Sequence, residues 1–334
     1  MTEVHNQSGR AVVVAPQFEV HPNANALMLA KVGGYTVVVR KDEWAQGDLG
    51  IYIPPDSVVA LEREEFKFLA AMPNSHPERI RIRRFRGVVS EGLLLRAPTG
   101  AVVGQDFTDQ LGITRYEAPI TNSGIYFASE EDEAPAISVP RFDVEALKKF
   151  PNVFRPGEEV VVTEKIHGAN GRYVYWDDRL RVGSRNRWVK DGDNIWWSAA
   201  RRNLWLEHWC KENPGYVLCG EVFGWVQDLR YGRDQGEVDF IVFDIFDTTS
   251  RTWWSPAAVS NEFGRFSAPW VFNGPFDDAR IIELADGPSL VGSADHIREG
   301  IVIRPMTERT DPVLETLGGR VMLKVVSNKY LERQ

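Results

Sequence analysis

The segment Glu164-Lys165-Ile166-His167-Gly168-Ala169-Asn170 decides how this chain is interpreted. It follows Val160-Val161-Val162-Thr163, whose β-branched side chains predict a strand that ends at the lysine. A lysine at a strand end can act as a nucleophile, because desolvation or a neighbouring cation lowers the pKa of an amine and frees its lone pair. Gly168 permits a tight turn against a ligand, and His167 and Asn170 can hydrogen-bond oxygen atoms. Taken alone, the segment could equally be a solvated turn.

Further polar residues follow Lys165 in a fixed order, each at the end of a predicted strand. They lie in Gly183-Ser184-Arg185-Asn186, Gly220-Glu221-Val222-Phe223-Gly224, Phe243-Asp244-Ile245, Glu299-Gly300-Ile301-Val302-Ile303-Arg304 and at Lys324. The two common phosphate-binding loops, Gly-x-x-x-x-Gly-Lys-Ser/Thr and Gly-x-Gly-x-x-Gly after a strand, are missing from the sequence. Nucleotide chemistry would need a different device, and a lysine at a strand end is one.

Together these motifs resemble those of the covalent nucleotidyltransferase superfamily, which contains ATP-dependent ligases and mRNA capping enzymes. The Lys-x-His-Gly-x-Asn form of the first motif looks like the nick-sealing RNA ligase branch. The resemblance covers Lys165 to Lys324. It implies that Lys165 is the catalytic residue, which displaces pyrophosphate from ATP and holds AMP as a phosphoramide. AMP would then pass to a 5′-phosphate at a nick, and a 3′-hydroxyl would attack that phosphate and expel AMP.

The same resemblance implies the roles of the neighbouring residues. Glu221 would bind the ribose hydroxyl, Phe243 would stack on adenine, and Lys324 would contact the α-phosphate. The full nucleotide-binding set expected from the motifs is Glu164, Ile166, His167, Asn170, Arg185, Glu221, Phe243, Glu299 and Lys324. Mg²⁺ or Mn²⁺ is the expected cofactor, organised by Glu299 and by Glu221, the contact in part through water. Asp244 is a further metal candidate, with the alternative that it is a structural hydrogen-bonding residue.

One position departs from the family pattern. Many relatives have Lys-x-Lys in the fifth motif, whereas here Val326 stands at the second lysine position. Three explanations stay open: Lys324 suffices alone, Lys329 supplies the second cation, or Arg304 does.

The sequence of the leading part of the chain predicts mainly β-strands. Short apolar runs at residues 11–14, 35–39, 50–53 and 92–95 are separated by turn-forming residues, which predicts a small barrel. This part resembles the OB-like module of the Deinococcus-type RNA ligase family. We therefore expect an α+β protein: an OB-like β-barrel at 1–115, a linker at 116–140, and an adenylyltransferase domain of antiparallel sheets with flanking helices at 141–334. Within the last domain, residues 142–150 and 193–212 each predict one helix.

An arginine cluster in the leading domain is a candidate nucleic-acid surface. Arg79, Arg81 and Arg83 alternate, so on a strand they would share one face and suit a phosphate backbone. The alternative is a charged edge strand that resists aggregation. In the catalytic domain, Arg304 is a fourth candidate for nucleic-acid contact.

Composition limits the remaining possibilities. The chain has 334 residues, a formal net charge of −8 and two cysteines, and no apolar run approaches the roughly 20 residues of a membrane helix. We expect a cytoplasmic enzyme that acts on nicked duplex RNA or an RNA–DNA hybrid, with RNA on the 3′-hydroxyl side, and without a membrane or an obligate protein partner.

Two rival hypotheses about the function remain. A DNA-joining or capping-type enzyme usually carries an OB-fold after the fifth motif, and here only residues 325–334 follow Lys324. A nucleic-acid-binding protein with an inactive ligase core is the rival from another class. The presence of Lys165, Glu221 and Glu299 argues against it.

Overall fold

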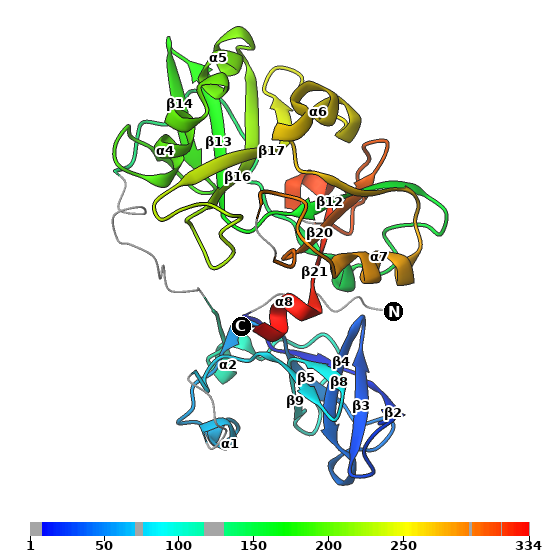
Figure 1. The fold of residues 1–334 in the computed structure, drawn as a ribbon. Helices are drawn as coiled ribbons and strands as arrows, with labels where there is room; N and C mark the ends of the chain where they lie inside the picture. The colour runs from blue at the N-terminus through cyan, green and yellow to red at the C-terminus, as the bar shows by residue number, and fades with distance from the viewer. Residues whose placement is uncertain (1–8, 71–75, 117–129, 294–295, 315, 334) are drawn as a thin grey trace. The chain divides into compact units, whose positions relative to one another are not determined.

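The computed structural model describes residues 9–70, 76–116, 130–293, 296–314 and 316–333 (Figure 1). The chain splits into two compact units, Met1–Ala118 and Pro119–Gln334. The division falls inside the stretch predicted to be a linker, of which residues 117–129 lie outside the described part. Residues after that gap already pack on the second unit, where Asp132 accepts a hydrogen bond from Arg179. None of the helices described is both long and apolar enough to cross a membrane.

The first unit consists of short antiparallel strands. They form the sheets β1-β5-β9, β2-β3-β4, β7-β8 and β6-β10. The strands are β1 (Val12–Val14), β2 (Gln17–Val20), β3 (Leu27–Val32), β4 (Tyr35–Arg40), β5 (Gly50–Ile53), β6 (Ser57–Val58), β7 (Ile82–Phe85), β8 (Val88–Glu91), β9 (Leu93–Arg96) and β10 (Thr114–Arg115). Three single-turn helices accompany them: η1 (Lys41–Glu43), α1 (Lys67–Ala70) and α2 (Thr108–Leu111).

Turn chemistry and alternation explain these strands. Arg86 and Gly87 join β7 to β8 with φ values of 47° and 87°, the positive pair that a two-residue hairpin requires. Along β4 the side chains alternate between buried and half-buried positions, as expected when one face meets a core. The predicted runs at 11–14, 35–39, 50–53 and 92–95 all fall on strands of this unit.

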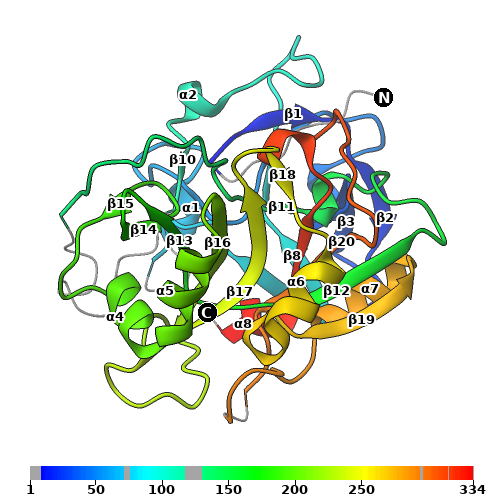
Figure 2. The same cartoon turned by 90° about the horizontal axis from the view of Figure 1, so that it is seen from above.

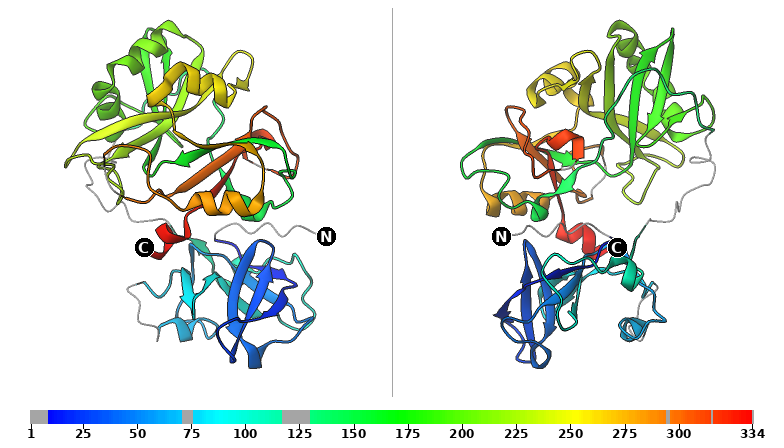
Figure 3. Two further views of the ribbon diagram at one scale, coloured as in Figure 1. Left: turned by 45° about the vertical axis from the view of Figure 1, so that its right-hand side comes forward. Right: turned by 180° about the vertical axis from the view of Figure 1, so that it is seen from behind.

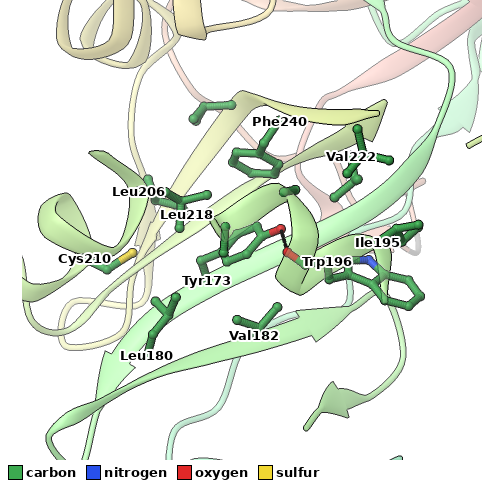
Figure 4. Packing of buried hydrophobic residues seen from close by; sticks show 14 of the residues in the cluster. Tyr173, Leu180, Val182, Ile195, Trp196, Leu206, Cys210, Leu218, Val222 and Phe240 are labelled. Atoms are coloured by element: carbon green, nitrogen blue, oxygen red, sulfur yellow. Dashed lines mark hydrogen bonds between the residues drawn. The ribbon is translucent and has the colours of Figure 1, made fainter. Parts of the chain in front are cut away.

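The second unit contains a six-stranded antiparallel sheet in the order β15-β14-β13-β16-β17-β18. Its strands are β13 (Ala169–Trp176), β14 (Arg179–Ser184), β15 (Trp188–Val189), β16 (Tyr216–Gly224), β17 (Val238–Asp247) and β18 (Thr252–Trp253). Helices α4 (Ile195–Arg202), α5 (Leu204–Glu212) and α6 (Pro256–Phe263) pack against this sheet (Figure 2). Between α4, α5 and the sheet, Tyr173 is fully buried and donates a hydrogen bond to the carbonyl of Trp196 (Figure 4).

The other sheet of this unit has five strands in the order β11-β21-β20-β12-β19. They are β11 (Glu145–Ala146), β12 (Glu159–Lys165), β19 (Trp270–Pro275), β20 (Gly300–Pro305) and β21 (Leu323–Val326). All its pairs are antiparallel except β11 with β21. Helix α7 (Asp278–Ala285) contacts β20 and β21 and covers one face of this sheet (Figure 3). The remaining helical turns are η2 (Leu147–Lys149), η3 (Gly264–Phe266), η4 (Thr316–Gly319) and α8 (Asn328–Arg333).

The chain passes from one sheet to the other just after the lysine. Strand β12 ends at Lys165 in the five-stranded sheet, and β13 begins at Ala169 in the six-stranded sheet. At Gly168, a Cβ atom would lie 2.1 Å from the carbonyl oxygen of Val222, so only glycine fits the crossing. The sequence predicted a close approach to a ligand here, whereas the close approach is to the backbone of β16.

A buried ion network connects the two sheets. Asp244 on β17 is fully buried, and its carboxylate accepts hydrogen bonds from Arg304 on β20, at 3.1 Å, and from Arg320. Glu308 in turn pairs with Arg320 at 2.7 Å. The prediction that Asp244 is a metal ligand is therefore wrong, because two guanidinium groups already occupy its oxygens. The structural alternative raised from the sequence fits the observed contacts.

Two helix predictions are wrong. Residues 142–150 form β11 and the 3-10 turn η2, because Glu145 and Ala146 pair with β21. Residues 193–212 form two helices, divided at Asn203. The side chain of Asn203 donates to the carbonyl of Ala199 and to Asp239 on the sheet, and these bonds end α4 and begin the turn into α5. At the start of α4, the side chain of Asn194 caps the helix by accepting a hydrogen bond from the backbone of Trp197.

We predict that Asp244→Ala lowers the free energy of unfolding by about 3–5 kcal/mol, because it leaves two buried guanidinium groups without their carboxylate. Urea unfolding followed by tryptophan fluorescence measures the change. Glu283→Ala on the exposed surface of α7 is the control and should shift stability by less than about 0.5 kcal/mol. A loss below about 1 kcal/mol for Asp244→Ala would contradict the assigned role.

Candidate active site

A pocket lies between the two sheets of the second unit. Its empty space, which includes the solvent at its open mouth, is about 770 Å³. Both sheets and the segment before β11 contribute to it. The lining residues are Phe142, Asp143, Val144, Thr163, Glu164, Lys165, Ile166, Asn170, Arg185, Glu221, Phe243, Ala268, Val302, Arg304, Met322 and Lys324.

Lys165 stands at the centre of this arrangement. Its register partner across β12 and β20 is Gly300, which places Glu299 next to the lysine side chain. The amine donates to both oxygens of Glu299, each at 2.7 Å. Glu299 is 8% exposed, so the carboxylate is held almost entirely by protein groups. Burial alone would raise the pKa of Glu299, but Lys165 and His167 lower it to about 2.

His167 contacts the same carboxylate from the other side. Its Nδ1 lies 3.2 Å from Glu299 Oε2, and its Nε2 lies 2.6 Å from Asp228 Oδ1. Burial opposes the charged imidazole, but the hydrogen bonds to Asp228 and Glu299 outweigh it and raise the pKa of His167 to about 9. The predicted contact between His167 and nucleotide is not what this geometry favours, since both ring nitrogens already face carboxylates.

Asn170 and Glu221 are cross-strand neighbours on β13 and β16, and both line the pocket. Burial raises the pKa of Glu221 to about 7, and the negative charge of Glu299 adds to this shift. Near neutral pH, Glu221 therefore exchanges readily between a hydrogen-bond donor and a negatively charged acceptor. Either form can bond a ribose hydroxyl.

Two further cations line the pocket beside Lys165. Lys324 on β21 lies opposite Val302 on β20. Burial together with the charge of Lys165 lowers the pKa of Lys324 to about 8. Arg185 follows β14, its side chain is 42% exposed, and its Nη1 lies 3.9 Å from Asp143. Three positive groups at one mouth suit a polyanionic ligand such as a triphosphate.

The pocket also has apolar lining residues. Phe142 and Phe243 pack with their ring centroids 4.4 Å apart, and Val302 and Met322 belong to the same apolar cluster. The hydrogen bond from Arg304 to the carbonyl of Phe243, at 3.4 Å, fixes the backbone below this ring. A flat apolar ring such as a purine base can be buried here.

The carboxylate of Glu164 does not face the pocket. Successive strand residues point to opposite sides, so Glu164 and Lys165 diverge. Glu164 is 1% exposed and accepts from Ser289 Oγ and from the backbone of Leu290, both at 2.6 Å. Glu164 nevertheless lines the pocket, so its predicted contact with nucleotide stays a prediction, which this geometry favours for the backbone and not for the carboxylate. Ile166 likewise packs in an apolar cluster with Phe223 and Tyr231 while bordering the pocket.

Neither Lys329 nor Arg304 is well placed to supply the second cation of the fifth motif. Lys329 is exposed on α8 and is not among the lining residues. Arg304 lines the pocket, but it is 4% exposed and bonded to Asp244. Its predicted contact with nucleic acid is therefore wrong, because an extended phosphate backbone cannot reach a buried guanidinium. Among the described residues, Lys324 and Arg185 are the cations beside Lys165 whose charged groups can face a ligand.

The arginine cluster of the first unit divides into two parts. Arg79 bonds Asp56 at 2.7 Å and stacks on Tyr116 at 3.8 Å from the ring centroid, so it supports the fold and is a poor candidate for nucleic-acid contact. Arg81 and Arg83 are half-buried at β7, and the neighbouring Arg84, Phe85 and Arg86 are exposed at the hairpin tip.

No group of three or more metal-binding side chains gathers among the described residues. Glu299 bonds the amine of Lys165, Glu221 lines the pocket, and the negative charge of Glu299 helps to raise the pKa of Glu221. A divalent ion could be held here only with additional ligands, which a triphosphate offers.

Sequence reasoning missed several residues. Asp228 and Tyr330 contact His167, and Phe142 and Asp143 line the pocket from a segment that was expected to be helical. Asp228 lies in a long irregular loop between β16 and β17, so no periodicity announces it. For Tyr330, the only signal was an aromatic residue shortly after the last predicted strand.

Two family models match this chain. A family model described as RNA ligase matches residues 158–326, and one described as an OB-fold domain matches residues 12–97. A curated protein, Protein Early 65 kDa of Autographa californica nuclear polyhedrosis virus, is 29% identical over 76 residues. That match spans 22% of this chain and 14% of the viral protein, so the chain covers only a small part of that relative.

Solved structures match over nearly the whole chain. A mutant of Naegleria gruberi RNA ligase in the apo form has a TM-score of 0.78 and 27% identity, covering 98% of this chain and 99% of the other. Another mutant of that ligase, with ATP and Mn, has a TM-score of 0.77 and 26% identity over 97% and 98% of the two chains. A third, with AMP and Mn, gives 0.77 and 27% over the same shares.

We predict that Glu221→Gln stabilises the nucleotide-free protein at pH 8 but hardly at pH 4.5. A raised pKa means that this group's stabilising contribution is complete below its unfolded value of 4.5 and is lost as the pH rises through about 7. Glutamine imitates the protonated form and removes that loss. Urea unfolding of both proteins at pH 4.5, 6 and 8 measures the difference, which should grow with pH. A difference that is constant or shrinks with pH contradicts the shift.

Proposed function

Because the chain belongs to the RNA ligase family, we propose that it is an ATP-dependent RNA ligase that seals 3′-hydroxyl/5′-phosphate nicks through a lysyl-AMP intermediate on Lys165. The RNA ligases of Naegleria gruberi that resemble it were solved with ATP and Mn or with AMP and Mn, and this supports ATP as a substrate and a divalent ion as a cofactor. We further propose that RNA is required on the 3′-hydroxyl side.

One observation carries the proposal. The amine of Lys165 opens into a pocket that combines cations for phosphates with an aromatic wall for a base, and the amine is held by a single buried carboxylate. A solvated surface lysine, the alternative raised from the sequence, would have neither the carboxylate nor the pocket. Its side chain is instead 24% exposed.

The first chemical step follows from this position. The ammonium of Lys165 gives up one proton to solvent, and the nitrogen lone pair forms a bond to the α-phosphorus of ATP. The bond from that phosphorus to the bridging oxygen breaks, and pyrophosphate leaves with the electron pair. Lys324 and Arg185 stabilise the negative charge on the phosphates. Effective attack requires that the amine and the leaving oxygen lie in line, so the position of Lys165 matters as much as its nucleophilicity.

A divalent ion would be held by Glu221 and Glu299 together with oxygens of the nucleotide. When bound, it would offset the negative charge between nucleophile and phosphates. To bind the ion, Glu299 would give up part of its contact with Lys165. This would also free the amine of Lys165.

The first unit supports a nucleic-acid partner. Its match to an OB-fold domain and the basic hairpin β7-β8 suit contact with phosphates. Exposed Arg84 and Arg86 flank Phe85, an aromatic side chain that is 36% exposed and could stack on a base. We propose this tip, rather than Arg79, as the contact point of the cluster.

We predict that the protein becomes labelled when incubated with α-³²P-ATP and Mn²⁺ or Mg²⁺, and that the label is acid-labile and resists denaturing electrophoresis. Lys165→Ala should abolish labelling, because it removes the amine that would form the bond to the α-phosphorus. Lys190→Ala, an exposed lysine paired with Glu130, is the control and should label normally. Equal labelling of Lys165→Ala would remove the basis of the proposal, and absence of label in the unmodified protein would favour the inactive-core alternative.

We predict that sealing depends on the sugar at the 3′-hydroxyl side. Duplex nicks that differ only in having RNA or DNA on that strand would be compared by single-turnover ligation on denaturing gels. The RNA-ended nick should be sealed at least about tenfold faster, which corresponds to about 1.4 kcal/mol of discrimination. Equal sealing of the all-DNA nick would instead support a DNA-joining enzyme. Transfer of the nucleotide to a 5′-diphosphate RNA end without sealing would support a capping-type enzyme.

A further inference from the structure

Three segments that are distant in the sequence meet behind the nucleophile. They are the turn after β12, which carries His167; the loop between β16 and β17, which carries Asp228; and α8, which carries Tyr330. The hydroxyl of Tyr330 donates to Asp228 Oδ1 at 3.2 Å and lies 3.1 Å from His167 Nε2. Asp228 Oδ1 is also the atom that faces His167 Nε2 at 2.6 Å. Two groups thus converge on one nitrogen of the imidazole.

The opposite nitrogen of the imidazole points to the reacting centre. His167 Nδ1 lies 3.2 Å from Glu299 Oε2, and Glu299 holds the amine of Lys165. A continuous line of hydrogen bonds therefore runs from Tyr330 and Asp228 through His167 and Glu299 to the nucleophile. The two nitrogens of an imidazole belong to one rigid ring and point in different directions. A contact that fixes Nε2 therefore also fixes the direction in which Nδ1 points.

The surroundings of Tyr330 indicate that its hydroxyl has this specific use. The residue is 2% exposed and packs in an apolar cluster with Ile166, Phe223 and Leu229. Burying a hydroxyl among apolar side chains is unfavourable unless it is hydrogen-bonded, and its bonds lead to Asp228 and His167. A phenylalanine would satisfy the packing equally well.

We propose that Asp228 and Tyr330 are positioning residues, which hold His167 so that Glu299 presents the amine of Lys165 in line for attack on the α-phosphorus. The inference rests on the proposed lysyl adenylylation. Neither residue is among those that line the pocket, so neither is expected to contact ATP. Their loss should therefore slow the formation of lysyl-AMP while leaving the affinity for ATP unchanged.

The test measures single-turnover formation of lysyl-AMP as a function of ATP concentration, which separates the maximal rate constant from the ATP concentration at half-saturation. Tyr330→Phe removes one hydrogen bond and should lower the rate constant about 3–10-fold. Asp228→Ala removes the main acceptor and should lower it about 10–100-fold. Asp228→Asn keeps an acceptor oxygen for Nε2 and should recover most of the loss. Half-saturation should stay within about twofold in all three, well below the tenfold that 1.4 kcal/mol would produce.

Matched controls separate positioning from stability. Tyr173→Phe removes a buried hydroxyl that donates to a backbone carbonyl at 2.9 Å in the helix-side core, and Tyr173 is not among the residues that line the pocket. Asp234→Ala removes an exposed carboxylate from the same loop as Asp228. Both should label at the rate of the unmodified protein. Thermal unfolding of every variant shows whether the two tyrosine variants lose comparable stability.

The outcomes are distinct. If the unmodified protein forms no lysyl-AMP, the proposed function fails. If it does, but Tyr330→Phe and Asp228→Ala label as fast as Tyr173→Phe, the positioning role is wrong. Asp228→Asn as slow as Asp228→Ala, or a rise in half-saturation without a fall in rate constant, would also overturn it. Should Asp228→Ala fail to fold, Tyr330→Phe compared with Tyr173→Phe carries the decision.

Discussion

The ion pair between Lys165 and Glu299 depends on the register in which β12 pairs with β20. Lys165 stands opposite Gly300, so the residue before Gly300 reaches the amine. A slip of one residue would turn every side chain of β12 to the other face and bring Glu164 to the pocket. The apolar residues Val160 and Val162 prevent such a slip, since they are fully buried in the core shared with Ile301 and Ile303. The hydrophobic face of this strand thus fixes the position of the nucleophile.

The strands that carry the site could be predicted because their signal is local. Residues 240–246 are apolar except for Asp244 and lie within β17, and the runs at 160–163 and 300–303 lie within β12 and β20. Motif order then predicted which residues meet, and Lys165, Asn170, Arg185, Glu221, Phe243 and Lys324 do line one pocket. Glu299, expected with them, lies behind the lysine.

The rest depended on contacts between distant segments. Whether Glu164 faces nucleotide or core is decided by the loop that brings Ser289 to it, 125 residues later. Asp244 became a structural residue because Arg320 approaches from a turn that no pattern marks. The helix expected at 193–212 divides because Asn203 finds Asp239 on the sheet, a partner that a helical periodicity does not reveal. Such polar side chains have their roles set by tertiary partners and not by spacing.

The buried carboxylate of Glu299 also has a consequence for the covalent intermediate. In the free protein it is balanced by two groups, the amine of Lys165 and the imidazole of His167. A phosphoramide nitrogen carries no positive charge, so adenylylation of Lys165 would leave only one of these two cations. The phosphoryl group of the bound AMP adds a negative charge of its own, so the interior of the pocket would become more negative than in the free protein, which repels departing pyrophosphate and opposes its return. The charge count of the resting site would thus favour the forward direction of the first step.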